Sequence, residues 1–322
     1  MLTAMNHKHQ QVFAQHASKS NQYYCPVCQA PVILRNGQTK VAHFAHRTHC
    51  RLKSSHPSES LEHLRYKHHI YQQCCMLGYD ANMEVWLPDI QQIPDILVQH
   101  TAIEVQLSPI SIKEIQQRTA GLNQLGYRVI WITRLPNIKR ELFQFSQLHQ
   151  TLIDHNNGHL ICIDPINLEL KRLAQLIPIT AKQFNAKVER ISIKACLDMT
   201  LKSQYINEIT VRKLSSSRLL DYLFQCRRKN SVLEPTLSLA YRLHMTDAQI
   251  LKVTGFLFPE QLYFQTHPVL WQLQVLYCHK YQLPIFQTLK SMMKIRYFYQ
   301  QNINIDVILE LLIKKYCKIL QI

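Results

Sequence analysis

The sequence predicts an α/β protein, in which a mixed core follows a small segment with cysteines and histidines and precedes a mostly α-helical, basic region. The order of patterns between residues 60 and 135 indicates a helix, two or three antiparallel strands, a second helix and a further strand. This order requires a crossover, which is typical of α/β cores. Glycine occurs only six times in 322 residues, which favours helix. Beyond about residue 180 the chain is rich in lysine and leucine, with prolines between short helical patterns.

Charge and composition restrict the classes of function. Lysine and arginine outnumber aspartate and glutamate by 37 to 21, and this net charge of +16 favours a polyanionic partner, most often nucleic acid. The six glycines form neither a dinucleotide-binding motif nor a P-loop. We expect a cytoplasmic protein, because the opening lacks a signal-peptide pattern and no apolar run has the length of a membrane span. Its ten cysteines are then expected to be thiols or metal ligands.

Changes in composition predict three parts. They are an N-terminal segment at 1–55, an α/β domain at 56–165 and a helical basic domain at 166–322. In the first part, "VILRNGQTKVA" predicts a hairpin that turns at Asn36-Gly37.

The expected elements of the second part have local start and stop signals. Ser58 or Ser60 can cap a helix that runs to about Leu77, before Gly78. Strands are expected at "EVWLPDI" and in "IPDILVQHTAIEVQLS", followed by a helix from 109 to about 125 with Ser108 as its cap. "YRVIWIT" predicts a strand, and "GHLICIDPINLELKRL" could be a further hairpin.

A metal site is predicted near the N-terminus. Cys25 and Cys28 are separated by two residues, a spacing that lets both sulfurs face one tetrahedral zinc. The stretch "HFAHRTHC" offers further ligands. If it is helical, His46 and Cys50 lie on one face and complete C-x2-C-x17-H-x3-C, while His43 with Cys50 is the close alternative and His49 is also present. We expect a structural Zn²⁺; the other interpretations are a redox pair and a nucleolytic histidine cluster.

Two carboxylates lie in the predicted hairpin 93–108. A two-residue loop at 99–100 places Asp95 opposite Glu104, and a loop at 100–101 places it opposite Gln106. Either register sends all three side chains to one face. Two carboxylates held close repel one another unless a cation neutralises them, and hard oxygen ligands suit Mg²⁺ or Mn²⁺. The alternative is that Asp95 only follows a proline in a turn while Glu104 faces solvent.

Two other polar patterns have a functional and a structural interpretation. Glu59, His63 and Lys67 form one stripe of the predicted helix, which is either solvated or part of a metal and phosphate site. The aromatic and basic stretch "KIRYFYQ" at 294–300 could stack on unpaired bases or could be ordinary helix core with a solvated face.

Several of these stretches resemble the CoiA-like competence proteins. The resemblance is carried by "YYCPVCQAPVILRNGQTKVAHFAH", "ESLEHLRYKHHIY", "IPDILV", "IEVQLSPISI" and "QRTAGLNQLGYRVIWI", and it covers residues 1–135 closely. It implies a zinc-finger-like segment followed by a restriction-endonuclease-like domain of the PD-(D/E)xK class. It also implies a cytoplasmic protein that processes incoming single-stranded transforming DNA and promotes its recombination, with the recombinase RecA as a candidate partner.

The resemblance also implies roles for individual residues. Asp95 corresponds to the metal-binding acid of the PD-(D/E)xK class, and Glu104 and Gln106 to its E-x-K pair. Glutamine replaces the lysine, so a positive charge near the attacking water is missing, and Lys67 could supply it. The expected reaction is Mg²⁺-dependent hydrolysis of a phosphodiester, with Glu59 as a further ligand and His63 or Lys67 on the phosphate. The rival is a non-catalytic DNA-binding protein that brings DNA and recombinase together, and an RNA-directed role rests on charge alone.

Overall fold

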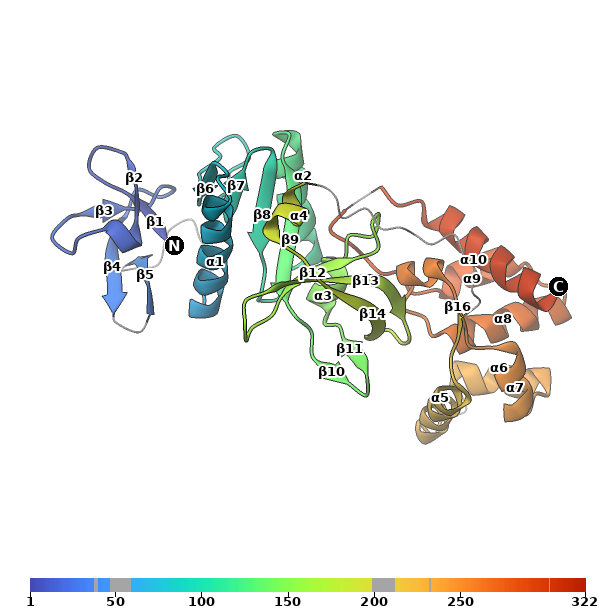
Figure 1. Cartoon of the computed structure of the whole chain (residues 1–322). Coiled ribbons are helices and arrows are strands. Elements are labelled where there is room, and N and C mark those ends of the chain that lie inside the picture. Colours follow the sequence, from blue (N-terminus) through green and yellow to red (C-terminus); the bar gives the residue numbers. More distant parts are fainter. Residues whose placement is uncertain (38–39, 47–58, 199–211, 232, 301) are drawn as a thin grey trace. The chain divides into compact units, whose positions relative to one another are not determined.

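The computed structural model describes residues 1–37, 40–46, 59–198, 212–231, 233–300 and 302–322 (Figure 1). The chain divides into two units. Unit 1 comprises Met1–Leu135, Leu160–Arg172 and Glu189–Lys202. Unit 2 comprises Pro136–His159, Leu173–Val188 and Ser203–Ile322. The domain boundaries expected at residues 55 and 165 remain predictions.

Unit 1 begins with a small antiparallel sheet in the order β2-β1-β3-β4-β5. Its strands are β1 (Thr3–Met5), β2 (Gln11–Phe13), β3 (Tyr23–Tyr24), β4 (Pro31–Gly37) and β5 (Lys40–His46), with a 3-10 turn η1 at Ala14–His16. The sheet has its own small core, in which the rings of Tyr23 and Phe44 lie 4.9 Å apart beside Val32. The predicted hairpin is β4–β5. Its turn, however, is not at Asn36-Gly37, because Gly37 belongs to β4 and pairs with Lys40.

The second sheet confirms the α/β interpretation of the next part. In unit 1 its strand order is β12-β9-β8-β7-β6, with antiparallel pairing at β6–β7–β8 and parallel pairing at β8–β9–β12. The strands are β6 (Ala81–Met83), β7 (Ile96–Val98), β8 (Thr101–Val105), β9 (Arg128–Arg134) and β12 (Leu160–Ile163). Helix α2 (Ile112–Gln124) is the predicted crossover between the parallel strands β8 and β9.

Alternate residues of these strands face different helices. Ile96, Ile103 and Ile130 pack with Tyr66 and Ile70 of α1 (Leu61–Met76), in a core that also includes α4 (Ile193–Leu197). The residues between them in sequence face α2 instead: the indole nitrogen of Trp131 donates to Thr119 of α2 at 3.0 Å. Period-two alternation thus decides which helix each strand side chain meets.

The helix caps were predicted with mixed success. Ser60 caps α1 by accepting a hydrogen bond from the backbone N–H of His63, as expected. Ser108 does not cap α2, because Ser111 does so by accepting from the N–H of Glu114 at 3.1 Å. A serine three residues before a glutamate is the better cap signal, and residues 109–110 therefore stay outside the helix.

The strand expected at "EVWLPDI" is also wrong. The strand there, β6, ends at Met83, and Glu84 has a left-handed backbone with φ of 53° that ends regular pairing. Residues 84–90 then contribute only an isolated bridge between Leu87 and Gln92. The possible hairpin after residue 158 is present as β12 and β13 (Leu170–Pro178), with the N–H of Asp164 bonded to the carbonyl of Glu169 at 2.9 Å.

Unit 2 combines β-strands with a helical region. Its strands follow the order β10-β11-β14-β13 and are β10 (Ile138–Lys139), β11 (Leu142–Gln144), β14 (Gln183–Arg190) and the later part of β13. A two-stranded sheet joins β15 (Arg212–Lys213) and β16 (Phe256–Leu257). The helices are α3 (Gln147–Thr151), α5 (Ser216–Arg228), α6 (Pro235–Leu243), α7 (Asp247–Val253), η2 (Pro259–Tyr263), α8 (Pro268–Lys280), α9 (Ile285–Met292) and α10 (Ile305–Leu320).

The prolines of the helical region mark helix starts. Pro235, Pro259 and Pro268 each occupy the first turn of a helix, where a missing N–H has no cost, and Pro284 is the N-cap of α9. The stretch 294–300 is largely core, since Arg296, Phe298 and Tyr299 are buried. In the described part of the chain no helix combines the length and apolar character that crossing a bilayer needs.

A partly buried histidine of unit 2 predicts a pH dependence of stability. His267 caps α8 and stacks on Tyr222 with ring centroids 3.5 Å apart, and burial lowers its pKa from 6.5 to about 3. Between about pH 3 and pH 6.5 the unfolded chain binds a proton at His267 and the folded chain does not. The contribution of His267 to the free energy of unfolding is therefore fully present above pH 6.5 and is lost as the pH falls. From pH 7 to pH 5 the loss is about 2 kcal/mol.

We expect His267→Asn, which keeps a capping side chain, to remove that part of the pH dependence. Urea unfolding followed by circular dichroism at pH 7 and pH 5 measures it in both proteins. An equal fall in the free energy of unfolding for the wild type and the variant would contradict a neutral, partly buried His267.

Candidate functional site

A pocket of about 200 Å³ lies in unit 1, between the start of α1, the end of the β7–β8 hairpin and the segment that leads into α2. Its polar lining comes from segments far apart in sequence. It includes Glu59, His63, Lys67, Glu84, Asp95 and Arg118, together with Gln106 and the amino group of Met1.

The predicted stripe of α1 faces this pocket rather than solvent. Glu59 lies just before the cap Ser60, and His63 and Lys67 follow one and two turns later. The Lys67 ammonium lies 2.5 Å from Glu59 Oε1, and His63 Nδ1 lies 3.6 Å from the same oxygen. The solvated interpretation of this stripe is therefore wrong.

The hairpin has the two-residue loop at Gln99-His100. Val98 pairs with Thr101 and Ile96 with Ile103, and this register places position 95 opposite position 104. Asp95 is buried at the entry to β7. Its Oδ2 accepts a hydrogen bond from the N–H of Val105 at 2.8 Å and lies 3.2 Å from His63 Nε2.

Lys67 is the centre of a buried ionic cluster. Its side chain is 1% exposed, and its ammonium lies 2.5 Å from Glu59, 2.5 Å from Glu84 and 3.3 Å from Asp95. The pairing engages Lys67 fully, so its expected contact with a phosphate would require it to leave three carboxylates. Burial alone would lower the pKa of Lys67, but Glu59, Glu84 and Asp95 outweigh burial and raise it well above its usual value.

Glu84 joins the small sheet to this cluster. Its left-handed backbone turns the carboxylate toward β1, where it accepts hydrogen bonds from the N–H groups of Leu2 and Thr3 and from the Thr3 hydroxyl at 2.8–2.9 Å. The same carboxylate binds Lys67. The sequence pattern gave no sign of this role, because position 84 lies in a segment that reads as a strand.

Glu104 has a different environment from Asp95. It lies on β8 opposite Trp131 of β9, its carboxylate is 1% exposed, and Oε2 accepts a hydrogen bond from the guanidinium of Arg118 on α2 at 2.6 Å. That guanidinium also lies 5.4 Å from the ring centre of Trp131. The two carboxylates thus contact different helices: α1 holds Asp95 and α2 holds Glu104. No local spacing in the sequence points to Arg118, which is fourteen residues beyond its partner.

Gln106 lines the pocket beyond the end of β8. Its backbone N–H donates to the carbonyl of Ile132 at 2.8 Å, and its side-chain amide donates to the carbonyl of Ser108 at 2.7 Å. This bond uses one of the two amide hydrogens, so the other hydrogen and the carbonyl oxygen remain for a ligand.

The buried acids differ in their protonation. Burial alone would raise the pKa of Asp95, but Lys67 and His63 outweigh burial and hold it below its usual value. The pKa of Glu59 is lowered in the same way, against burial, by Lys67. Burial raises the pKa of Glu104 to about 7; Arg118 opposes this shift and Asp95 adds to it. Asp95 and Glu59 are therefore anionic near neutral pH, whereas Glu104 exchanges a proton there.

Three of these side chains could hold a metal ion. One ligand atom each from Glu59, His63 and Asp95 lies within 4.8 Å of the other two. Two carboxylates and an imidazole suit a divalent ion such as Mn²⁺, and carboxylates suit Mg²⁺. Burial tends to lower the pKa of His63, but Asp95 outweighs it and raises the pKa, so a metal would have to displace a proton there. Glu104 is outside this group of three.

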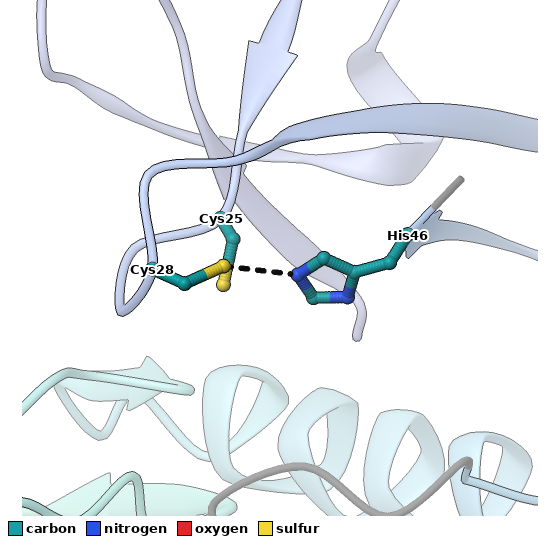
Figure 2. A group of neighbouring side chains, drawn as sticks. All are labelled: Cys25, Cys28 and His46. Carbon is teal, nitrogen blue, oxygen red and sulfur yellow. Dashed lines mark hydrogen bonds between the residues drawn. The ribbon is translucent and has the colours of Figure 1, made fainter. Parts of the chain in front are cut away.

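A second group of possible ligands lies in the small sheet. Cys25 and Cys28 flank a tight turn in which the N–H of Gln29 bonds back to the carbonyl of Cys25 at 3.0 Å. Figure 2 shows both sulfurs facing the imidazole of His46, with Cys28 Sγ 3.3 Å from His46 Nε2. His46 lies on strand β5, so the helical condition under which His46 and Cys50 would share one face is not met at this residue.

The remaining candidate ligands are placed differently. His43, also on β5, has its Nδ1 2.9 Å from the carbonyl oxygen of Val41 and is outside the group of three. His49 and Cys50 lie outside the described residues. Burial lowers the pKa of His46, which favours the neutral ring that a metal ligand requires.

Comparisons with known proteins place the chain in a family. The model described as "Competence protein CoiA, nuclease-like domain" matches residues 59–205, and the model described as "Competence protein CoiA, N-terminal domain" matches residues 5–53. A curated protein of Bacillus subtilis (strain 168), "Competence protein CoiA", is 28% identical over 183 residues, which are 54% of this chain and 49% of the relative. The chain thus spans about half the length of that relative. No solved structure matches it.

The two matched segments contain both groups of side chains described above. The nuclease-like match begins at Glu59 and includes Asp95, Glu104 and Arg118, and the N-terminal match includes Cys25 and His46. The chain belongs to the CoiA-like family of competence proteins, and it has that family's nuclease-like domain.

Proposed function

We propose that this protein is a metal-dependent deoxyribonuclease that acts on incoming transforming DNA. The observation that carries the proposal is the convergence of Glu59, His63 and Asp95 within 4.8 Å of one another, in a pocket that Gln106 also lines. The nuclease-like family match supports it. The net charge of +16 suits a polyanionic substrate.

The donor set fits a divalent ion, and the carboxylates of Asp95 and Glu59 would hold it, with the nitrogen of His63. A bound Mg²⁺ or Mn²⁺ would activate water and stabilise the charge that develops on the phosphate. Lys67 keeps both carboxylates ionised and in place. The side-chain amide of Gln106, which also lines the pocket, would orient the attacking water.

Arg118 supplies the positive charge that Gln106 does not. Its guanidinium lines the pocket and is fixed between Glu104 and Trp131. A guanidinium forms strong paired hydrogen bonds with phosphate oxygens. Glu104, whose pKa burial raises to about 7, can take up a proton beside this guanidinium.

We further propose a structural Zn²⁺ at Cys25, Cys28 and His46. Two thiolates and an imidazole are ligands that zinc prefers, and Cys50 or His43 would complete four. The small sheet has few buried side chains, so a metal would stabilise it where burial is limited. In the wider proposal the α/β part of unit 1 is a PD-(D/E)xK domain and the protein is cytoplasmic. Its partners are single-stranded transforming DNA and the recombinase RecA.

One observation favours a second function, a DNA-binding accessory protein without turnover. Lys67 and the amino group of Met1 already lie against Glu59, at 2.5 Å and 2.9 Å, so the cluster is partly neutralised from within. A metal must share its ligands with these ammonium groups. In this case the same fold would bring DNA and recombinase together.

The proposed nuclease site predicts loss of activity in Asp95→Asn, which removes a charged ligand but keeps the shape of the side chain. We expect Mg²⁺- or Mn²⁺-dependent cleavage of labelled single-stranded, duplex or branched DNA to fall by at least about a hundredfold. Asp89→Asn, which changes an exposed carboxylate of the same unit, is the matched control and should cleave normally. Cleavage by Asp95→Asn at the wild-type rate would refute the site. Salt-sensitive binding without any product in the wild type would favour the accessory function.

If Arg118 contacts the phosphate and not the metal, removal of its charge should slow cleavage without weakening metal binding. In Arg118→Gln we expect cleavage to fall by about tenfold or more while Mn²⁺ affinity, measured by calorimetry, stays near that of the wild type. Arg118→Lys should recover part of the rate, because it restores the charge without the paired geometry. If Arg118→Gln abolishes Mn²⁺ binding, the residue is part of the scaffold for Asp95 and not a phosphate contact.

The zinc proposal predicts one tightly bound zinc per chain in the purified protein. Cys28→Ser should lose it, as measured by elemental analysis, and should lower the midpoint of thermal unfolding. Cys75→Ser, which alters an exposed cysteine of α1, is the control and should keep the metal. A wild-type protein that takes up no zinc under reducing conditions would rule the site out.

A further inference from the structure

A group of tyrosines and basic residues covers one exposed part of unit 2, at the C-terminal ends of α6 and α8. These helices pack together in one core. We name this surface the α6–α8 tyrosine patch, and it consists of Tyr241, Arg242, Tyr277, Lys280 and Tyr281. No sequence motif marks it, because the two halves are more than thirty residues apart.

The patch faces solvent. Tyr241 is 81% exposed and Tyr281 is 46% exposed. The rings of Tyr277 and Tyr281 lie 4.7 Å apart, and the Tyr281 hydroxyl donates to the carbonyl of Arg242 at 3.2 Å. A single exposed tyrosine needs no explanation. Here, however, ring and backbone contacts hold an aromatic platform in place.

The two cations of the patch lie against aromatic rings and not against acidic side chains. The Arg242 guanidinium lies 5.9 Å from the centre of the Tyr277 ring, and the Lys280 ammonium lies 5.5 Å from that of Tyr281. Within the described ranges neither cation forms a salt bridge. Asp247, the acid that follows α6 most closely in sequence, is paired with Arg227 at 2.5 Å. The patch therefore has uncompensated positive charge next to exposed aromatic faces.

We propose that the α6–α8 tyrosine patch binds single-stranded nucleic acid. Tyr241 and Tyr281 stack on unpaired bases, and Arg242 and Lys280 contact phosphates of the same strand. Proteins that bind single strands commonly combine exposed aromatic rings with cations, because every base has a face that can stack on a ring. A duplex hides its base faces, so the patch favours unpaired strands. The proposal concerns a second site and does not depend on cleavage at Asp95.

The test measures binding with the full-length Asp95→Asn protein, which prevents cleavage without a chelator that would remove zinc. Fluorescence anisotropy uses labelled oligo-dT and oligo-U of about 16 nucleotides, the upper range of known site sizes, and a duplex of equal length. We expect Tyr241→Ala/Tyr281→Ala to weaken single-strand binding by roughly tenfold for each ring removed. Tyr241→Phe/Tyr281→Phe keeps both rings and should bind single strands more tightly than the double alanine variant does.

The charges are tested separately from the rings. Arg242→Gln/Lys280→Gln should lower the slope of log affinity against log salt by roughly 0.7 for each phosphate that the variant no longer neutralises. Two single changes elsewhere in unit 2 are the controls, Tyr297→Ala for an exposed ring and Lys318→Ala for an exposed cation, and both should bind normally. A preference between oligo-dT and oligo-U identifies DNA or RNA as the strand.

Two results would overturn the proposal. One is unchanged single-strand affinity in both Tyr241→Ala/Tyr281→Ala and Arg242→Gln/Lys280→Gln. The other is unchanged affinity together with a shift of sedimentation toward smaller species in Tyr241→Ala/Tyr281→Ala, which would make the patch an interface between copies of the chain. Loss of DNA cleavage in Asp95→Asn with intact binding leaves the patch supported, so the two proposals fail independently.

Discussion

The pocket of unit 1 is organised by one buried ammonium group. Lys67 is held by Glu59, Glu84 and Asp95, which come from the start of α1, the end of β6 and the entry to β7. Burying four charges is costly in desolvation, and only close, well-satisfied pairing offsets it. If the lysine were removed, three carboxylates would repel one another in a region with little water. The geometry of the candidate metal ligands therefore depends on a residue that is not itself a ligand.

The same cluster divides two neighbouring acids between two electrostatic environments. Asp95 stays ionised because Lys67 and His63 lie beside it, whereas burial brings the pKa of Glu104 to about 7 in spite of Arg118. Pairs of titratable groups whose pKa values are pushed apart are a frequent property of sites that transfer protons. The register that places these residues opposite one another brings them near, and the two helices α1 and α2 then give them different partners.

Much of the α/β part followed from the sequence because its signals are local. Of the two loop positions that the sequence allowed for the hairpin, the structure has Gln99-His100, and of the two possible caps of α1 it has Ser60. The crossover helix and the buried strand at Arg128–Arg134 follow from hydrophobic patterns of different period. At 294–300 the burial of Phe298 confirms the expected core, but the helix expected there is wrong, because α9 ends at Met292 and α10 begins at Ile305.

The parts that sequence patterns missed depend on contacts between distant residues. Glu84 lies in an apolar stretch, and its left-handed backbone and its contact with β1 have no local signal. Arg118 meets Glu104 only because α2 crosses over the sheet. The segment at His43–His46 has a spacing that suits a helix, yet pairing with β4 makes it a strand. Tertiary pairing overrides local preference in such cases.

The hydrogen bonds from residues 2 and 3 to Glu84 have a consequence for modularity. The N-terminal family match ends at residue 53 and the nuclease-like match begins at residue 59, so the small sheet and the α/β part are matched as separate domains. A chimera joined there would leave the Glu84 carboxylate without its backbone donors and Lys67 with a displaced counterion. The two pieces are thus parts of one electrostatic assembly, and a graft of the α/β part onto another scaffold needs a replacement for the backbone donors of Leu2 and Thr3.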